Sequence, residues 1–154
     1  MTSPATHRSS RTILASPRAI FRTLLDPETI PAWRAPRGTS IRIEQFEPRT
    51  GGTYRIVLTY PQAGDVPNQS HASVDTINGQ FAEILPDERI VEIVQIETGD
   101  PRYNGVMRLT TMLEPLKDGT KVTLIAEDVP PDASENDHRA GMEMTLRNLA
   151  NFVE

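Results

Sequence analysis

The spacing of apolar residues changes along the chain and predicts which segments are helices and which are strands. A short strand is expected at Ser10–Leu14, and apolar residues then recur at intervals of three and four between Pro17 and Trp33, as on one face of a helix. From Thr39 to Ala126 apolar and polar residues alternate, which is typical of strands with one buried face. A helical period returns between Ser134 and Val153.

Cap residues divide the first helical region into two short helices. Ser16-Pro17 supplies an N-cap followed by proline at the first helical position, and Asp26-Pro27 repeats this signal. Pro36 and Gly38 end the second helix. Two brief helices are therefore expected between the first strand and the long series of strands.

Turn signals divide the alternating region into antiparallel strands. Gly51-Gly52, Pro86-Asp87 and Asp118-Gly119 each separate two apolar runs, and short turns of this kind join neighbouring antiparallel strands. Asn78-Gly79 lies inside one run, where a bulge is favoured because a two-residue turn would leave very short arms. Segment 61–70, with two prolines and no apolar period, is expected to be a loop.

The last helix is expected to pack on this sheet. Ser134 with Asp137 three residues later matches an N-cap pattern, and Met142, Leu146 and Leu149 share one apolar face. The predicted fold class is therefore α+β, with about six or seven antiparallel strands, two short helices after the first strand, and a long C-terminal helix on the sheet.

Composition limits the number of domains and the classes of partner. With 154 residues, 37% of them hydrophobic, residues 9–154 are expected to form a single domain after a mobile arm at 1–8. The net charge of −5 gives no support for binding to nucleic acid. The chain has no cysteine, no apolar run of membrane-spanning length and no signal-peptide segment at its start. A cytoplasmic location without a membrane span is expected.

Local motifs occur in the same order as in a known family. They are Ala15-Ser16-Pro17 with Ile20-Phe21 and Leu24, Asp26-Pro27-Glu28, Trp33 with Pro36 and Gly38, Gly51–Arg55, Gly79–Ile84 with Pro86 and Glu88–Val91, and Asp118–Leu124. This set resembles the SRPBCC branch related to the activator of the ninety-kilodalton heat-shock chaperone ATPase. The element order resembles the helix-grip superfamily, which includes START lipid-transfer domains and the birch-pollen allergen. The resemblance implies a curved sheet that wraps the last helix around a cavity, while function does not follow from fold alone.

Two departures from that branch affect the expected function. The branch often has tryptophan after the glycine of the last helix, whereas Gly141 is followed here by Met142, a flexible side chain that changes the cavity wall. The chaperone activator also has a separate N-terminal domain, for which a chain of 154 residues has no room. Chaperone activation therefore has little support.

The expected cavity lining follows from the alternation of side chains along strands. If Val91 and Ile93 point inward, Gln95 and Glu97 do too, and Gln95 is then a buried amide that needs a partner. The predicted lining is mostly apolar, as small-molecule pockets usually are. It consists of Trp33, Tyr54, Ile56, Leu58, Phe81, Val91, Ile93, Gln95, Met107, Leu109, His138, Met142 and Leu146. Plain core packing with no ligand stays an open alternative.

The residues that carry chemistry are few. His7, His71 and His138 lack the helical spacing of a metal motif, so no metal site is expected. His138 lies one helical turn before Met142 and is a candidate acid, base or ligand donor at the cavity mouth, with a solvated surface position as the alternative. No P-loop or dinucleotide fingerprint is present, and no cofactor is expected.

Three functional hypotheses remain. The first is binding of a small hydrophobic or amphipathic molecule between the sheet and the last helix, because the predicted inner face is apolar. The second is a cavity enzyme of the cyclase or aromatase type, which needs at least two converging polar groups. The third is a stress- or chaperone-related interaction module, and a homodimer is left open. Ligand identity does not follow from the sequence.

Overall fold

The computed structural model describes residues 5–35, 38–60, 74–97, 105–131 and 133–154. The predicted loop at 61–70 lies outside them. The elements in these ranges are β1 (Ala5–Ile13), α1 (Pro17–Leu24), α2 (Ile30–Trp33), β2 (Ser40–Phe46), β3 (Thr53–Thr59), β4 (Val74–Leu85), β5 (Arg89–Glu97), β6 (Gly105–Leu116), β7 (Gly119–Val129) and α3 (Glu135–Val153).

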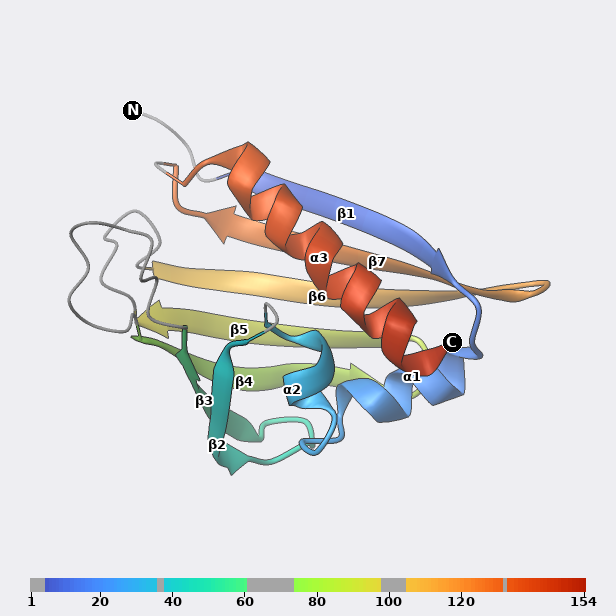
Figure 1. Ribbon diagram of the computed structural model, residues 1–154, viewed down its shortest axis with the longest axis horizontal. Coiled ribbons are helices and arrows are strands. Elements are labelled where there is room, and N and C mark those ends of the chain that lie inside the picture. The colour runs from blue at the N-terminus through green and yellow to red at the C-terminus, as the bar shows by residue number, and fades with distance from the viewer. Residues whose placement is uncertain (1–4, 36–37, 61–73, 98–104, 132) are drawn as a thin grey trace.

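The strands form one antiparallel sheet in the order β1-β7-β6-β5-β4-β3-β2. β2 to β7 follow one another as a meander, and β1 pairs with β7 at the opposite edge from β2. The sheet curves around α3, while α1 and α2 lie in the connection between the two edges (Figure 1). This arrangement confirms the predicted α+β helix-grip fold.

The short helices begin as their cap residues dictate, with one difference. The Ser16 hydroxyl accepts a 3.1 Å hydrogen bond from the Ala19 amide, which fixes the start of α1. In the second region Asp26 accepts instead from the Glu28 amide, 3.0 Å away. This local bond makes a turn, and α2 begins only at Ile30.

The long helix α3 crosses the concave face of the sheet, from the side of β1 and β7 toward α1 (Figure 1). The Ser134 hydroxyl caps it by accepting a 3.2 Å hydrogen bond from the Asp137 amide. Its buried face consists of Met142, Leu146, Leu149 and Ala150. This face closes the core against the sheet.

The first strand starts earlier than predicted. β1 begins at Ala5, so residues 5–8 belong to the sheet and not to an arm. His7 is only 2% exposed. The error arose because the polar sequence of β1 lies at an edge, where one face needs no apolar residues.

Strand β4 is continuous through Asn78-Gly79, but the predicted bulge is not there. Gly79 pairs regularly with Tyr54 on β3 and with Val94 on β5, and the register shifts instead between Phe81 and Glu83. A Cβ on Gly79 would overlap the Tyr54 ring. Glycine is therefore needed at this position for close approach of an aromatic side chain.

Candidate functional site

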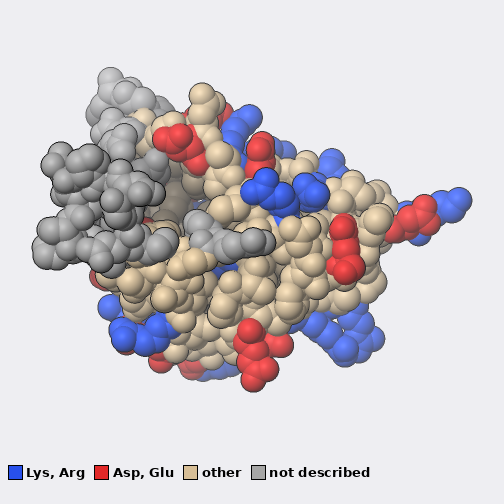
Figure 2. Space-filling model, viewed as in Figure 1, with Lys and Arg blue, Asp and Glu red and all other residues tan. Residues whose placement is uncertain are grey.

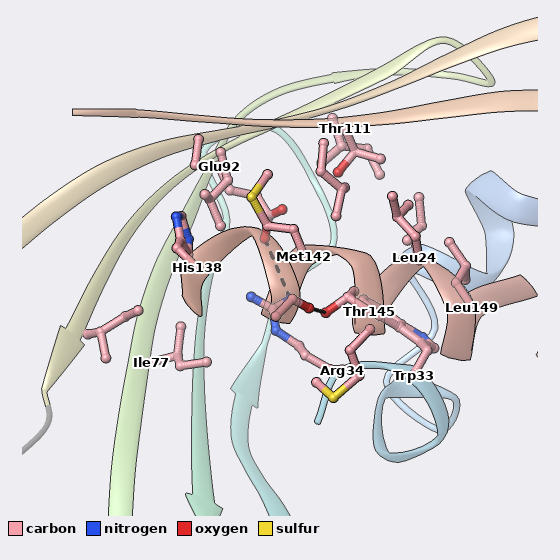
Figure 3. Close-up of a pocket in the computed structure, with 18 of the residues that line it drawn as sticks. Leu24, Trp33, Arg34, Ile77, Glu92, Thr111, His138, Met142, Thr145 and Leu149 are labelled. Carbon is pink, nitrogen blue, oxygen red and sulfur yellow. Dashed lines mark hydrogen bonds and ion pairs between the residues drawn. The ribbon is translucent and has the colours of Figure 1, made fainter. Parts of the chain in front are cut away.

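A cavity of about 470 Å³ lies between α3 and the concave face of the sheet. Figure 3 shows His138 at one end and Leu24, Trp33 and Leu149 at the other, with Arg34 and Glu92 between them. Most of the lining is apolar and comes from α1, α2, α3 and the inner face of the sheet. The size falls within the range of small-molecule sites.

The predicted residues divide into two groups by position. Those in the cavity lining are Trp33, Leu58, Phe81, Leu109, His138, Met142 and Leu146. Tyr54 and Ile56 are buried in the adjoining core, and Met107 packs in a second cluster that includes Met142. Trp33 donates from its indole nitrogen to the Thr29 hydroxyl at 3.1 Å, which anchors α2 beside the cavity.

The predicted register of β5 was wrong by one residue. Ile90, Glu92 and Ile96 line the cavity, so Val91, Ile93 and Gln95 belong to the opposite face of the strand. Gln95 is exposed and Val91 is buried outside the cavity. Both faces of this strand carry apolar residues and each also carries a glutamate, Glu92 on one and Glu97 on the other, so alternation could not choose between them.

The inward Glu92 belongs to a buried polar cluster that sequence patterns did not indicate. The Tyr54 hydroxyl donates to Glu92 Oε1 at 2.6 Å, and Arg34 Nη2 donates to the same hydroxyl at 3.1 Å. Arg34 Nη1 lies 3.8 Å from Glu92 Oε1. The Arg34 guanidinium also lies over the Tyr54 ring, 5.2 Å from its centroid. We call Arg34, Tyr54 and Glu92 the polar triad.

The protonation of the triad follows from its burial. Burial raises the pKa of the Tyr54 phenol above its ordinary value, Arg34 opposes this, and the Glu92 charge adds to it. Burial acts to lower the pKa of Arg34, but the neighbouring Tyr54 and Glu92 oxygens outweigh it, so that pKa is raised. The triad therefore contains a neutral phenol that donates a hydrogen bond to Glu92 and a guanidinium that keeps its charge.

His138 contacts a residue that the sequence did not associate with it. His138 Nδ1 on α3 lies 2.7 Å from His7 Nδ1 on β1. One ring must donate and the other accept, so the contact needs at least one neutral imidazole. Burial, together with the charge of His7, lowers the pKa of His138. A separation of 131 residues left no local signal for this pair.

The remaining observations concern metals, membranes and surface charge. Within the described ranges, no cluster of three or more histidines or carboxylates is placed to hold a metal ion. Likewise, no helix in those ranges has both the length and the apolar character needed to cross a membrane. Figure 2 shows acidic and basic side chains interspersed on the face it presents.

Comparison with known proteins gives a family and several similar folds. A crystal structure of a Chromobacterium violaceum protein has a TM-score of 0.84 at 25% identity, covering 98% of this chain and 99% of that one. A protein from Rhizobium loti has a TM-score of 0.74, also at 25% identity, covering 98% of each chain. A Rhodobacter sphaeroides protein has a TM-score of 0.76 at 22% identity, covering 98% of this chain and 93% of that one.

No curated protein sequence matches this chain. Residues 14–154 match the family described as activator of Hsp90 ATPase homolog 1-like protein. The match spans α1 to α3 and so includes every element that contributes to the cavity and the polar triad. The chain therefore belongs to the activator of Hsp90 ATPase homolog 1-like family.

Proposed function

We propose that this protein binds a small hydrophobic or amphipathic molecule in the cavity between α3 and the sheet. The observation that carries this proposal is a largely apolar cavity of about 470 Å³ with Arg34 and Glu92 in its wall. Apolar walls favour transfer of a hydrocarbon body from water, and a few fixed polar groups set its orientation.

A thermal-shift series with apolar ligands tests the proposal. A ligand that binds only the folded state stabilises it by about 2.7 kcal/mol at one hundred times its dissociation constant. Leu109 lines the cavity, and Leu109→Trp places a larger side chain in the space for the ligand. Leu116→Trp makes the same change at an exposed position outside the cavity. We expect the shift to survive Leu116→Trp and to vanish in Leu109→Trp. Equal shifts in both variants would place binding elsewhere.

A second candidate function is a cavity enzyme. The observation in its favour is His138, which lines the cavity and hydrogen-bonds to His7, because a neutral imidazole is suited to transfer protons. This candidate predicts that a bound molecule leaves the cavity chemically changed. Mass spectrometry of the ligand before and after incubation distinguishes it from simple binding.

A further inference from the structure

The polar triad leaves hydrogen-bonding groups of both kinds in the cavity wall. Arginine carries five N–H donors, and Arg34 uses one of them on the Tyr54 hydroxyl. Nη1 lies 3.8 Å from Glu92 Oε1, an ion pair without a hydrogen bond. Glu92 Oε1 accepts from Tyr54, and among the described residues no donor reaches Oε2. Donors and an acceptor therefore lie side by side.

The charge of Arg34 is already balanced. Glu92 lies beside it, and the side chains of the pair are only 15% and 12% exposed. Among the described residues, the other carboxylates of the lining are Asp75 and Asp137, and Arg34 is the only lysine or arginine, so this part of the wall offers no unbalanced positive charge. An anionic ligand group placed here would lose its water and meet the Glu92 charge at reduced dielectric, where like charges repel strongly. A cationic group placed against the Arg34 guanidinium would meet a like charge in the same way.

We propose that the polar group of the ligand is electrically neutral, both donates and accepts hydrogen bonds, and binds Arg34 and Glu92 together. A carboxamide or a hydroxyl meets this description, since it can donate to Glu92 Oε2 and accept from Arg34. The apolar body then extends toward Trp33, Leu24 and Leu149 at one end of the cavity (Figure 3). This inference rests on the proposed function and names the ligand class of the same site.

Four compounds with the same ten-carbon chain test the inference: decanamide, decan-1-ol, decanoate and decylamine. Their affinities are measured at about pH 7.5, where decanoate is an anion and decylamine a cation, by displacement of fluorescent N-phenyl-1-naphthylamine from the unmodified protein. We expect the amide and the alcohol to bind at least about tenfold more tightly than either ion. Equal or tighter binding of decanoate or decylamine overturns the inference.

Glu92→Gln locates the effect. The variant keeps the shape of the side chain but leaves the charge of Arg34 unbalanced, so decanoate should gain at least about tenfold relative to decanamide. Glu97→Gln makes the same change on the exposed end of β5 and should leave the ratio unchanged. If both variants leave the ratio unchanged, the triad is not the recognition site.

The failures of the two proposals differ in outcome. If none of the four compounds displaces the probe, the proposed function fails and this inference with it. If all four bind equally, the cavity binds ligands but the inference is wrong. The ratio of affinities between the neutral and the ionic compounds is measured on the unmodified protein. It therefore tests the inference even if the Glu92→Gln variant does not fold.

Discussion

The Tyr54 hydroxyl donates a 2.6 Å hydrogen bond to Glu92, across the intervening strand β4. This bond explains how a glutamate can point into an apolar cavity. A buried carboxylate is stable only when it is paired and hydrogen-bonded, and Glu92 has Tyr54 as donor and Arg34 as counter-ion. Three separate elements, the end of α2, β3 and β5, are thereby tied together.

Removal of the Tyr54 hydroxyl should destabilise the fold. Tyr54→Phe keeps the ring against Gly79 but leaves Glu92 without its donor, and an unsatisfied buried group costs about 1–3 kcal/mol. Chemical denaturation measures the loss. Tyr60→Phe is the control, because Tyr60 hydrogen-bonds to Asp75 but is less buried, and it should cost less. Equal losses would contradict a special role for the triad.

Arg34 and Glu92 should be energetically coupled. Arg34→Leu leaves a buried carboxylate without its counter-ion, which costs about 3–5 kcal/mol. The double variant with Glu92→Leu should then be less destabilised than the sum of the single variants by at least about 1 kcal/mol. The exposed pair Arg55 and Glu44, 3.1 Å apart, supplies the control cycle, with coupling of about 0–1 kcal/mol. Additive losses at Arg34 and Glu92 would show that the two charges do not interact.

Two glycines should respond in opposite ways to alanine. At Gly79 the new Cβ would overlap the Tyr54 ring, so Gly79→Ala should destabilise by about 1–3 kcal/mol. At Gly141, inside α3, nothing lies within 4 Å of the new Cβ. Gly141→Ala should therefore stabilise by about 0.4–1 kcal/mol. Unfolding free energies measured in urea check both, and a neutral Gly79→Ala would contradict the close approach.

Stability should fall in mildly acidic solution because of the histidine pair. Burial lowers the folded-state pKa of His138, so the unfolded chain takes up its proton first as the pH falls. The contribution is fully present above the unfolded pKa of about 6.5 and is lost as the pH falls through the folded-state pKa. Unfolding free energies at several pH values between about 8 and 5.5 measure this. His138→Asn should flatten the curve, and an unchanged curve would rule out the pair as its cause.

The sequence predicted the fold because its signals were local. Ser16 and Ser134 cap α1 and α3 as expected, and turn residues separate the strands. The family resemblance supplied the curved sheet around the last helix. Those features depend on neighbours along the chain or on an ordered series of motifs, and the structure has them as predicted.

The site was predicted only in part, because its polar residues depend on distant contacts. Glu92 points inward because Tyr54 and Arg34, 38 and 58 positions earlier, satisfy it. His7 is buried because it meets His138 on the last helix. The spacing of apolar residues along the chain does not indicate contacts between residues so far apart in sequence. Each register of β5 places one glutamate on the inner face, Glu92 in one register and Glu97 in the other. The polar residues therefore gave no reason to prefer either register.

Trp33 offers the most direct test of ligand binding in the cavity. It is the only tryptophan in the chain, and it lines the cavity. Titration with 10-bromodecan-1-ol, whose bromine quenches indole fluorescence on contact, is compared with titration by decan-1-ol. The account predicts saturable quenching at one ligand per chain by the brominated compound alone. A brominated ligand that stabilises the protein without quenching Trp33 would contradict it.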